Sequence, residues 1–186
     1  MPTADKVTAG KPKTTGAIFR APLGTTLPAD ATTELTAAFK DLGFASDEGL
    51  TNTPGSESTD VYAWGGTPVL NTLSEKSDEW AITLLESLNP EVLKTVYGDA
   101  NVTVDSSGKT ITVRAGADQR PNAVYVFDLA LKGGALKRVV IPNGALAEVG
   151  EIVYKDNEPV GYKITIKAMD DGSGATHHEY IMLPTT

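Results

Sequence analysis

The chain has 186 residues and a formal net charge of −8, with 40% hydrophobic and 22% charged residues. This length suits one domain or one domain with an arm, and the composition is that of a folded globular chain. Without cysteine the chain has neither disulfides nor thiolate metal sites. With no signal-peptide pattern and no apolar run near the roughly 18 residues of a membrane span, we expect a soluble protein made in the cytoplasm.

Charge is distributed unevenly along the chain. Up to Arg20 there are four basic residues and one acidic residue, so the remaining residues carry a net charge of −11. Phosphate neutralisation by Lys and Arg dominates nucleic-acid affinity, so we expect this acidic body not to bind DNA or RNA. The acidic surface could equally serve solubility alone.

Residues 1–15 are rich in Lys, Thr, Pro and Gly and have no apolar period, which predicts a flexible N-terminal arm. Leu35, Phe39 and Leu42 then recur at helical spacing before Gly43. This spacing predicts a short helix or an irregular turn packed on the core.

Residues 51–77 form the least typical segment. A polar start is followed by Val61, Tyr62 and Trp64, a Gly65-Gly66 turn, and then Val69 and Leu70. The pattern predicts a long hairpin loop carrying a large aromatic side chain. Trp64 either anchors a partner surface or folds back on its own core, and we expect neighbouring subunits to order the hairpin.

The next segments predict strands and one helix. Trp80, Ile82 and Leu84 alternate with less apolar residues, as in a half-buried strand. Asn89, Pro90 and Glu91 are typical of a helix start, and Gly98 is a typical stop. We therefore predict a helix of about two turns over 89–98, lying across a sheet.

Two further elements precede the C-terminal part. Residues 102–104 and 111–113 are expected to pair across an Asp105 to Gly108 turn. Residues 123–131 are apolar on nearly both faces, which predicts a central strand.

Residues 135–169 show three strand-like runs divided by turn residues, and from Val160 to Ala168 apolar and polar residues alternate strictly. We expect a meander with one face toward the core and one face exposed to solvent. Short strands at regular spacing with one short helix predict a mainly β fold, a β-sandwich or barrel. The predicted organisation is the arm at 1–15 and a single β domain over 16–183.

The sequence indicates no catalytic, cofactor-binding or metal site. Gly108-Lys109-Thr110 lacks the first glycine of a phosphate-binding loop and precedes a strand. His177 and His178 are neighbours in an extended segment, so they point to opposite faces and are interpreted as surface imidazoles. The turn at Asp170-Asp171-Gly172 lacks the final Glu of a calcium loop and is interpreted as a hairpin turn.

Four motifs follow one another along the chain: Gly16 to Thr25, Asp41 to Leu50, Asp60 to Gly66, and the meander from Ile141 to Tyr162. In this order and spacing they resemble the major tail tube protein of long-tailed, non-contractile phages of actinobacteria. The resemblance implies two antiparallel sheets with a flanking helix, in a structural virion protein whose hexameric rings stack into a tube. Genomic DNA would pass down the lumen without specific binding.

The same resemblance implies partners and a location. The chain would contact itself, the tape measure protein, and the tail tip and tail terminator proteins. It would be assembled in the host cytoplasm, reside in the virion tail, and have no membrane partner. No enzymatic activity is expected.

Two sets of residues follow as candidate sites. The predicted oligomer interface comprises Val61, Tyr62, Trp64, Gly65, Gly66, Val69 and Leu70. Since an acidic lining repels phosphate, carboxylates are predicted to face the lumen, with Asp41, Glu48, Glu148 and Glu151 as candidates.

Two other functions remain open from the sequence. An immunoglobulin-like or carbohydrate-binding module of a surface protein would share the strand pattern, and should carry an exposed aromatic row. A hydrolase with a carboxylate pair is the enzyme alternative, because Asp and Glu are plentiful.

Overall fold

The computed structural model describes residues 6–13, 17–116 and 119–184. Residues 1–5, 14 and 15 of the predicted arm and Gly16 of the predicted domain lie outside this part of the chain. The strands are β1 (Gly10–Pro12), β2 (Ile18–Pro22), β3 (Lys40–Asp41), β4 (Thr51–Tyr62), β5 (Pro68–Leu84), β6 (Val102–Val104), β7 (Ile111–Val113), β8 (Ala123–Leu131), β9 (Leu136–Val149), β10 (Tyr162–Ala168) and β11 (His178–Met182). One α-helix, α1 (Pro90–Tyr97), is followed by a single 3₁₀ turn over Asp99–Asn101.

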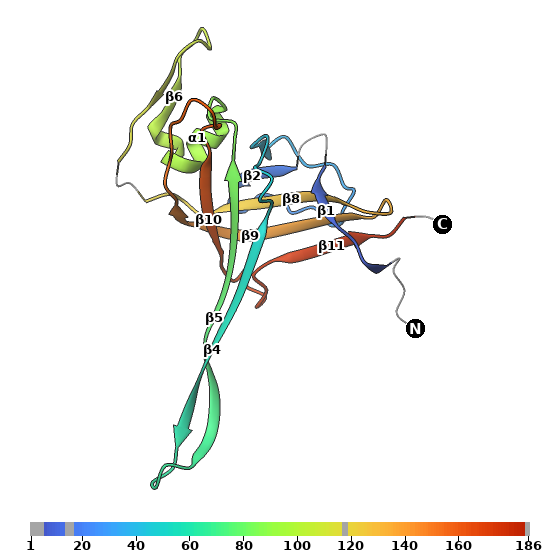
Figure 1. Cartoon of the computed structure of the whole chain (residues 1–186), viewed down its shortest axis with the longest axis vertical. Coiled ribbons are helices and arrows are strands. Elements are labelled where there is room, and N and C mark those ends of the chain that lie inside the picture. Colours follow the sequence, from blue (N-terminus) through green and yellow to red (C-terminus); the bar gives the residue numbers. More distant parts are fainter. Residues whose placement is uncertain (1–5, 14–16, 117–118, 185–186) are drawn as a thin grey trace.

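The described strands form two antiparallel sheets of unequal size, which confirms the predicted mainly β fold with two sheets and one short helix. The larger sheet has the order β3-β2-β8-β9-β10-β5-β4, with β1 added beside β8 and β11 beside β9. The smaller sheet is the β6–β7 hairpin, whose predicted pairing of Val102 with Val113 is confirmed. Figure 1 shows the β4–β5 ribbon extending away from the body, opposite the end that carries α1 and β6.

Strand β9 turns the corner of the larger sheet. Its first half pairs with β8 and β11, whereas residues 144–149 pair with β10. The change of partner falls at Gly144, which pairs with both β8 and β10 and where a Cβ atom would come within 2.7 Å of the Tyr125 ring. Strands that pass from one layer to another through a bend or bulge are the usual corners of such packings. The sheet therefore folds over on itself and encloses a core.

The main core lies between the two layers of this folded sheet. Trp80 of β5 stacks on Phe127 of β8 with ring centroids 6.3 Å apart. Ile164 and Ile166 of β10 are fully buried in the same cluster, while Lys163, at one of the alternate positions, is exposed to solvent. The alternation predicted for residues 160–168 is thus confirmed, and so is the central position of β8.

Helix α1 covers one end of this core. Asn89 caps it by accepting a hydrogen bond from the Glu91 backbone N–H at 3.0 Å, and Pro90 stands in the first turn. Gly98 ends the helix with a positive φ of 98°. Val92, Leu93 and Val96 are buried, so the predicted helix and its apolar face are confirmed.

The other face of β8 and β9 is covered by the irregular segment 23–39. Phe39 and Leu35 of this segment pack in a second cluster with Val124 and Val126. Arg138 of β9 donates hydrogen bonds to the carbonyls of Asp30 and Thr33 at 3.0 and 2.7 Å. Of the two structures predicted for Leu35 to Leu42, a short helix or an irregular turn, the irregular turn is therefore the one present, and it leads into β3.

Two details differ from the expectations. The first two runs of the predicted meander are one continuous strand, β9, and residues 150–161 have no strand. Bulges in its pairing let β9 carry the turn-like residues Pro142 to Gly144 without breaking. In the predicted arm, Gly10–Pro12 form β1, paired with β8.

Candidate assembly surfaces

The β4–β5 ribbon is built by strand pairing over its whole length within one chain. The register runs from Thr51 opposite Ala81 to Tyr62 opposite Pro68. At the turn, the N–H of Ala63 donates to the carbonyl of Thr67 at 2.8 Å, and Gly65 and Gly66 adopt positive φ angles of 106° and 84°. The predicted hairpin is confirmed, and all of its strand pairing lies within one chain.

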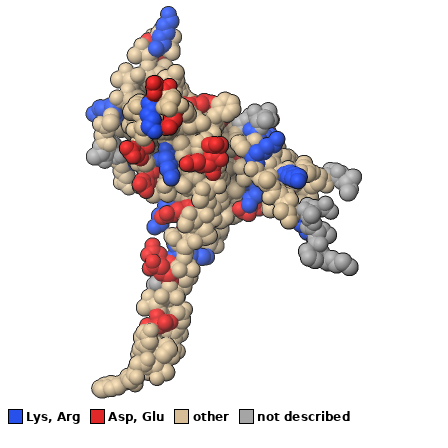
Figure 2. Space-filling view, viewed as in Figure 1, with Lys and Arg blue, Asp and Glu red and all other residues tan. Residues whose placement is uncertain are grey.

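The end of this ribbon is apolar and exposed. Trp64 has a relative exposure of 106%, so the interpretation that it folds back on its own core is wrong. The residues from Val61 to Ser74 include no Asp, Glu, Lys or Arg, and Figure 2 shows the same region without charge. The exposed large apolar residues there are Val61, Tyr62, Trp64, Val69, Leu70 and Leu73. An exposed apolar patch of this kind marks an interaction surface.

The second surface is a wall of four strands, which we define as β4, β5, β10 and residues 144–149 of β9. Its inner face carries Trp80, Ile82 and Ile166 into the core. Its outer face carries the alternate positions, which are mostly small or hydroxyl side chains. The outer residues are Thr51, Thr53, Glu79, Ala81, Thr83, Ala145, Glu148, Lys163, Thr165 and Lys167.

This wall has an edge on each side. Among the described strands, β4 pairs only with β5, and residues 145–149 of β9 pair only with β10. Each step from β4 to β9 is antiparallel, so β4 and β9 run in opposite directions. Unpaired edges of this length invite pairing with another chain.

The four predicted lumen carboxylates do not share one surface. Glu148 lies on the outer face of the wall, opposite Thr165, and Glu151 follows directly after β9. Glu48 lies in an exposed loop beside the end of β5, where the Ser46 N–H donates to the carbonyl of Thr83. Asp41 lies on β3, separated from β9 by β2 and β8.

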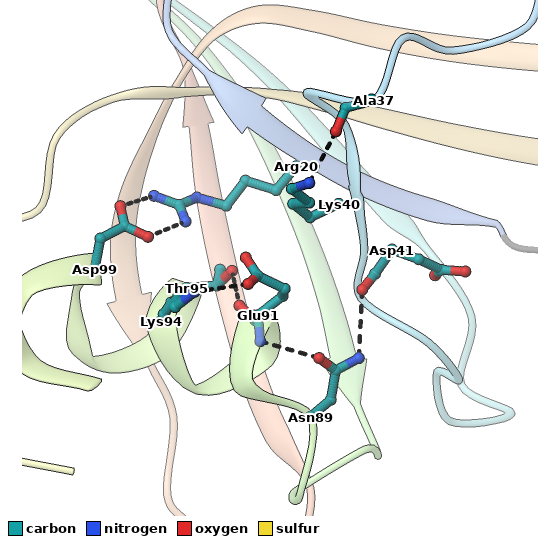
Figure 3. A network of polar contacts seen from close by, with 9 residues as sticks. All are labelled: Arg20, Ala37, Lys40, Asp41, Asn89, Glu91, Lys94, Thr95 and Asp99. Atoms are coloured by element: carbon teal, nitrogen blue, oxygen red, sulfur yellow. Dashed lines mark hydrogen bonds and ion pairs between the residues drawn. The ribbon is translucent and has the colours of Figure 1, made fainter. Parts of the chain in front are cut away.

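A group of charged residues lies where α1 meets β2 and β3 (Figure 3). Arg20 donates two hydrogen bonds to the Asp99 carboxylate, at 2.9 and 2.7 Å, and Lys94 pairs with Glu91 at 2.7 Å. The hydrogen bonds from Arg20 hold the pKa of Asp99 below its usual range. The pair of Arg20 and Asp99 ties the 3₁₀ turn after α1 to β2, and the pair of Lys94 and Glu91 lies within α1. Both ion pairs therefore have a structural role.

The two histidines bind different carboxylates. His177 donates from Nδ1 to Asp78 at 2.5 Å, since a carboxylate only accepts, and His178 Nε2 lies 3.0 Å from Asp171. Their divergence is as predicted, but His177 also contacts the Trp80 ring edge-on at 5.0 Å and is not a simple surface imidazole. Nothing in the sequence links positions 78 and 177, so this contact could not be found from the sequence.

Exposed aromatic side chains are spread over separate parts of the described chain. Phe44 lies in the loop after β3, Tyr62 and Trp64 lie on the ribbon, and Tyr154 lies after β9. A row of aromatics, as in a carbohydrate-binding face, would need them on one surface. This distribution does not favour the surface-module alternative.

A family model described as phage tail tube protein matches residues 6–185 of the chain. The chain belongs to the phage tail tube protein family. No curated protein sequence matches it. Membership places the chain among structural components of the phage tail that assemble with copies of themselves into a tube, and this family is not a class of enzymes. No helix in the described ranges is long and apolar enough to cross a membrane.

Proposed function

We propose that this tail tube protein closes into hexameric rings, and that these rings stack into the tube of a long-tailed, non-contractile phage of actinobacteria. The observation that carries the proposal is the four-stranded wall with one unpaired edge on β4 and one on β9. Six copies of this wall would form one continuous barrel, with the outer face of the wall toward the lumen.

The direction of the strands supports this closure. A rotation about the ring axis keeps each strand pointing the same way along the axis. Because β4 and β9 run in opposite directions, β9 of one subunit meets β4 of the next as an antiparallel pair. Closure of the ring would satisfy both edges and leave no free edge around the barrel.

The lumen would then be lined by a polar face that does not hold DNA. Lys167 lies directly opposite Glu79 in the pairing of β10 with β5, and Glu148 lies opposite Thr165. Lys163 lies opposite Thr83 and lines the same shallow hollow as Glu79 and Glu148. Carboxylates close to both lysines reduce their attraction for phosphate. In this arrangement Glu148 and Glu151 are the candidates for lumen carboxylates, and Asp41 lies away from the wall.

The ribbon would make the contact between rings. Its uncharged end, with Val61, Tyr62, Trp64, Val69 and Leu70 around the Gly65-Gly66 turn, has the composition of the buried centre of an interface. It would dock on a subunit of the adjacent ring. At the ends of the tube the same surfaces would meet the tape measure, tail tip and tail terminator proteins, after assembly in the host cytoplasm.

Disulfide cross-linking tests the ring closure, because the chain has no native cysteine. Thr51 or Thr53 of β4 is replaced by cysteine together with Ala145 or Ala147 of β9, so that the four combinations sample neighbouring registers. A disulfide forms only when the two Cβ atoms are about 3.5–4.5 Å apart. We expect one register to give, after oxidation of assembled tubes, a ladder of covalent oligomers that ends at the hexamer.

The control is a variant with Ser107→Cys and Thr53→Cys, which places one cysteine in the turn between β6 and β7, away from the wall. It should give no ladder. Tubes visible by negative-stain electron microscopy without a ladder in any of the four combinations would contradict closure through these edges. If the wild-type protein forms no tubes at high concentration, the chain does not assemble into tubes by itself.

A further inference from the structure

The ribbon leaves the body at Asp78, and this carboxylate is a centre of hydrogen bonds. Asp78 is only 6% exposed, although it stands on β5 two residues before the core residue Trp80. Beyond this point, from residue 55 to residue 73, nearly all described ribbon side chains are exposed. Asp78 therefore marks the root of the ribbon.

Three donors from two other segments converge on this carboxylate. Asn52 of β4 donates to Oδ1 at 2.7 Å. Thr176 and His177, which precede β11, donate to Oδ2 at 2.7 and 2.5 Å. Bonds to a buried charged group are the stronger kind of hydrogen bond, and they fix the geometry of the groups involved.

The segment that supplies Thr176 and His177 is itself held in place. Asp171 accepts hydrogen bonds from the backbone N–H and the hydroxyl of Ser173, at 2.8 and 2.6 Å, and lies beside His178. Asn143 of β9 donates to the carbonyl of Asp170 at 3.2 Å. Residues 170–177 thus form a strap, which ties the ribbon root to β9 and β11.

The length of the ribbon makes the root angle important. The eleven or so residues from the root to the turn span about 35 Å at ~3.3 Å per residue, so a swing of about 10° at the root moves the end by about 6 Å. A displacement of this size would take Trp64 out of any pocket shaped for it. Between Gly55 and Leu73 the ribbon contributes no side chain to either core cluster, so its direction depends on its root.

We propose that Asp78 is the positioning residue of the ribbon: its bonds to Asn52, Thr176 and His177 fix the direction in which the ribbon leaves the body. This role rests on the proposed function, in which the end of the ribbon docks on an adjacent ring. Loss of the hydrogen bonds to Asp78 lowers the fraction of subunits that have a correctly directed ribbon. The apparent affinity for assembly falls in proportion to that fraction.

Distance measurement between two spin labels tests the direction of the ribbon in the unassembled chain. Thr67→Cys at the turn and Lys163→Cys on β10 place one label on the ribbon and one on the body, and both positions are exposed. Asp78→Asn keeps the size of the side chain and removes its charge. We expect the distance distribution of the Asp78→Asn variant to broaden by about two-fold or more. Tube formation by the same variant without labels should slow by about ten-fold, as expected if one tenth of the subunits have a correctly directed ribbon.

The matched control is Asp60→Asn, the same change at an exposed carboxylate on the ribbon that accepts a hydrogen bond from Asn71. It should leave the distribution unchanged. Thr176→Val removes one donor and serves as the test if Asp78→Asn does not fold. An unchanged distribution in a folded root variant would overturn the proposal, as would a broadened distribution with wild-type assembly. Because the distances are measured without tubes, a wild-type chain that forms none would count against the proposed function and not against this role.

Discussion

At the scale of single residues, the buried pair of Asp128 and Arg138 holds three parts of the chain together. Arg138 donates from Nε and Nη2 to the two oxygens of Asp128, at 2.6 and 2.8 Å, and from Nη1 to the irregular segment 23–39. Arg138 is 2% exposed and Asp128 is 5% exposed. Removal of one partner leaves a buried charge without compensation.

We therefore expect Asp128→Ala to lower the free energy of unfolding by about 3–5 kcal/mol. The comparison is Asp99→Ala, which breaks the partly exposed pair with Arg20 and should cost about 0.2–1 kcal/mol. Denaturant unfolding measures both variants. If the two variants lose a similar free energy of unfolding, the burial of Asp128 does not determine how much its ion pair contributes to stability.

The acid dependence of stability follows from carboxylates whose pKa is lowered in the folded chain, among them Asp78, Asp99 and Asp171. Burial raises the pKa of Asp78, but the hydrogen bonds from Thr176, His177 and Asn52 lower it more. The bond from Arg20 lowers the pKa of Asp99, and the Ser173 hydroxyl lowers that of Asp171 to about 2. A carboxyl group with a lowered pKa contributes stability above its unfolded pKa, and this contribution is lost as the pH falls through the folded pKa.

The melting temperature should therefore be nearly constant above about pH 5 and fall from about pH 4 toward pH 2, as these groups become protonated. Asp171→Asn should flatten the lower part of this fall. Thermal unfolding by circular dichroism across this range provides the measurement. A variant curve with the wild-type slope between pH 2 and 4 would exclude Asp171 as a contributor.

At the scale of elements, the ribbon is separable from the core. Its residues between Gly55 and Leu73 contribute no side chain to either core cluster. Replacement of this stretch by a short flexible linker should leave a folded monomer that forms no tubes. Calorimetry and negative-stain microscopy measure the two properties; tubes of normal diameter would show that the ribbon is not needed for assembly.

A single substitution at the end of the ribbon should separate assembly from stability more finely. Trp64→Ala removes a side chain that is fully exposed in the single chain, so the melting temperature should stay within a few degrees of wild type. Tube formation should weaken by about ten-fold or more, because a central aromatic typically contributes at least ~2 kcal/mol to an interface. Thr67→Ala at the same turn is the control and should assemble normally.

At the scale of the whole molecule, we expect divalent metal ions to be unnecessary. Within residues 6–13, 17–116 and 119–184 no group of three or more His, Asp or Glu side chains is arranged to hold a metal ion. Dialysis against a chelator should leave both the melting temperature and preformed tubes unchanged. Tubes that dissolve, and form again when calcium is returned, would reveal a site between subunits.

Patterns with a local physical cause could be predicted from the sequence alone. The alternation of residues 160–168, the Asn89-Pro90 helix start and the Gly65-Gly66 turn each depend on neighbours in the chain, and the structure has all three. Charge can be summed from a sequence but not placed in space, so the sequence could not assign Asp41, Glu48, Glu148 and Glu151 to one surface. Only Glu148 lies on the outer face of the wall.

The remaining features depended on contacts between distant positions. Gly144 of β9 leaves room for the Tyr125 ring, which a Cβ atom there would clash with, and the Asp78 centre joins residues about a hundred positions apart. Whether Trp64 is buried or exposed depends on the length of the ribbon, which sequence periodicity does not encode. The sequence thus determined the β class, the helix and the apolar hairpin, because these follow from local propensity and period. Which edges stay open, and where the ribbon points, was decided only when the sheet folded over its core.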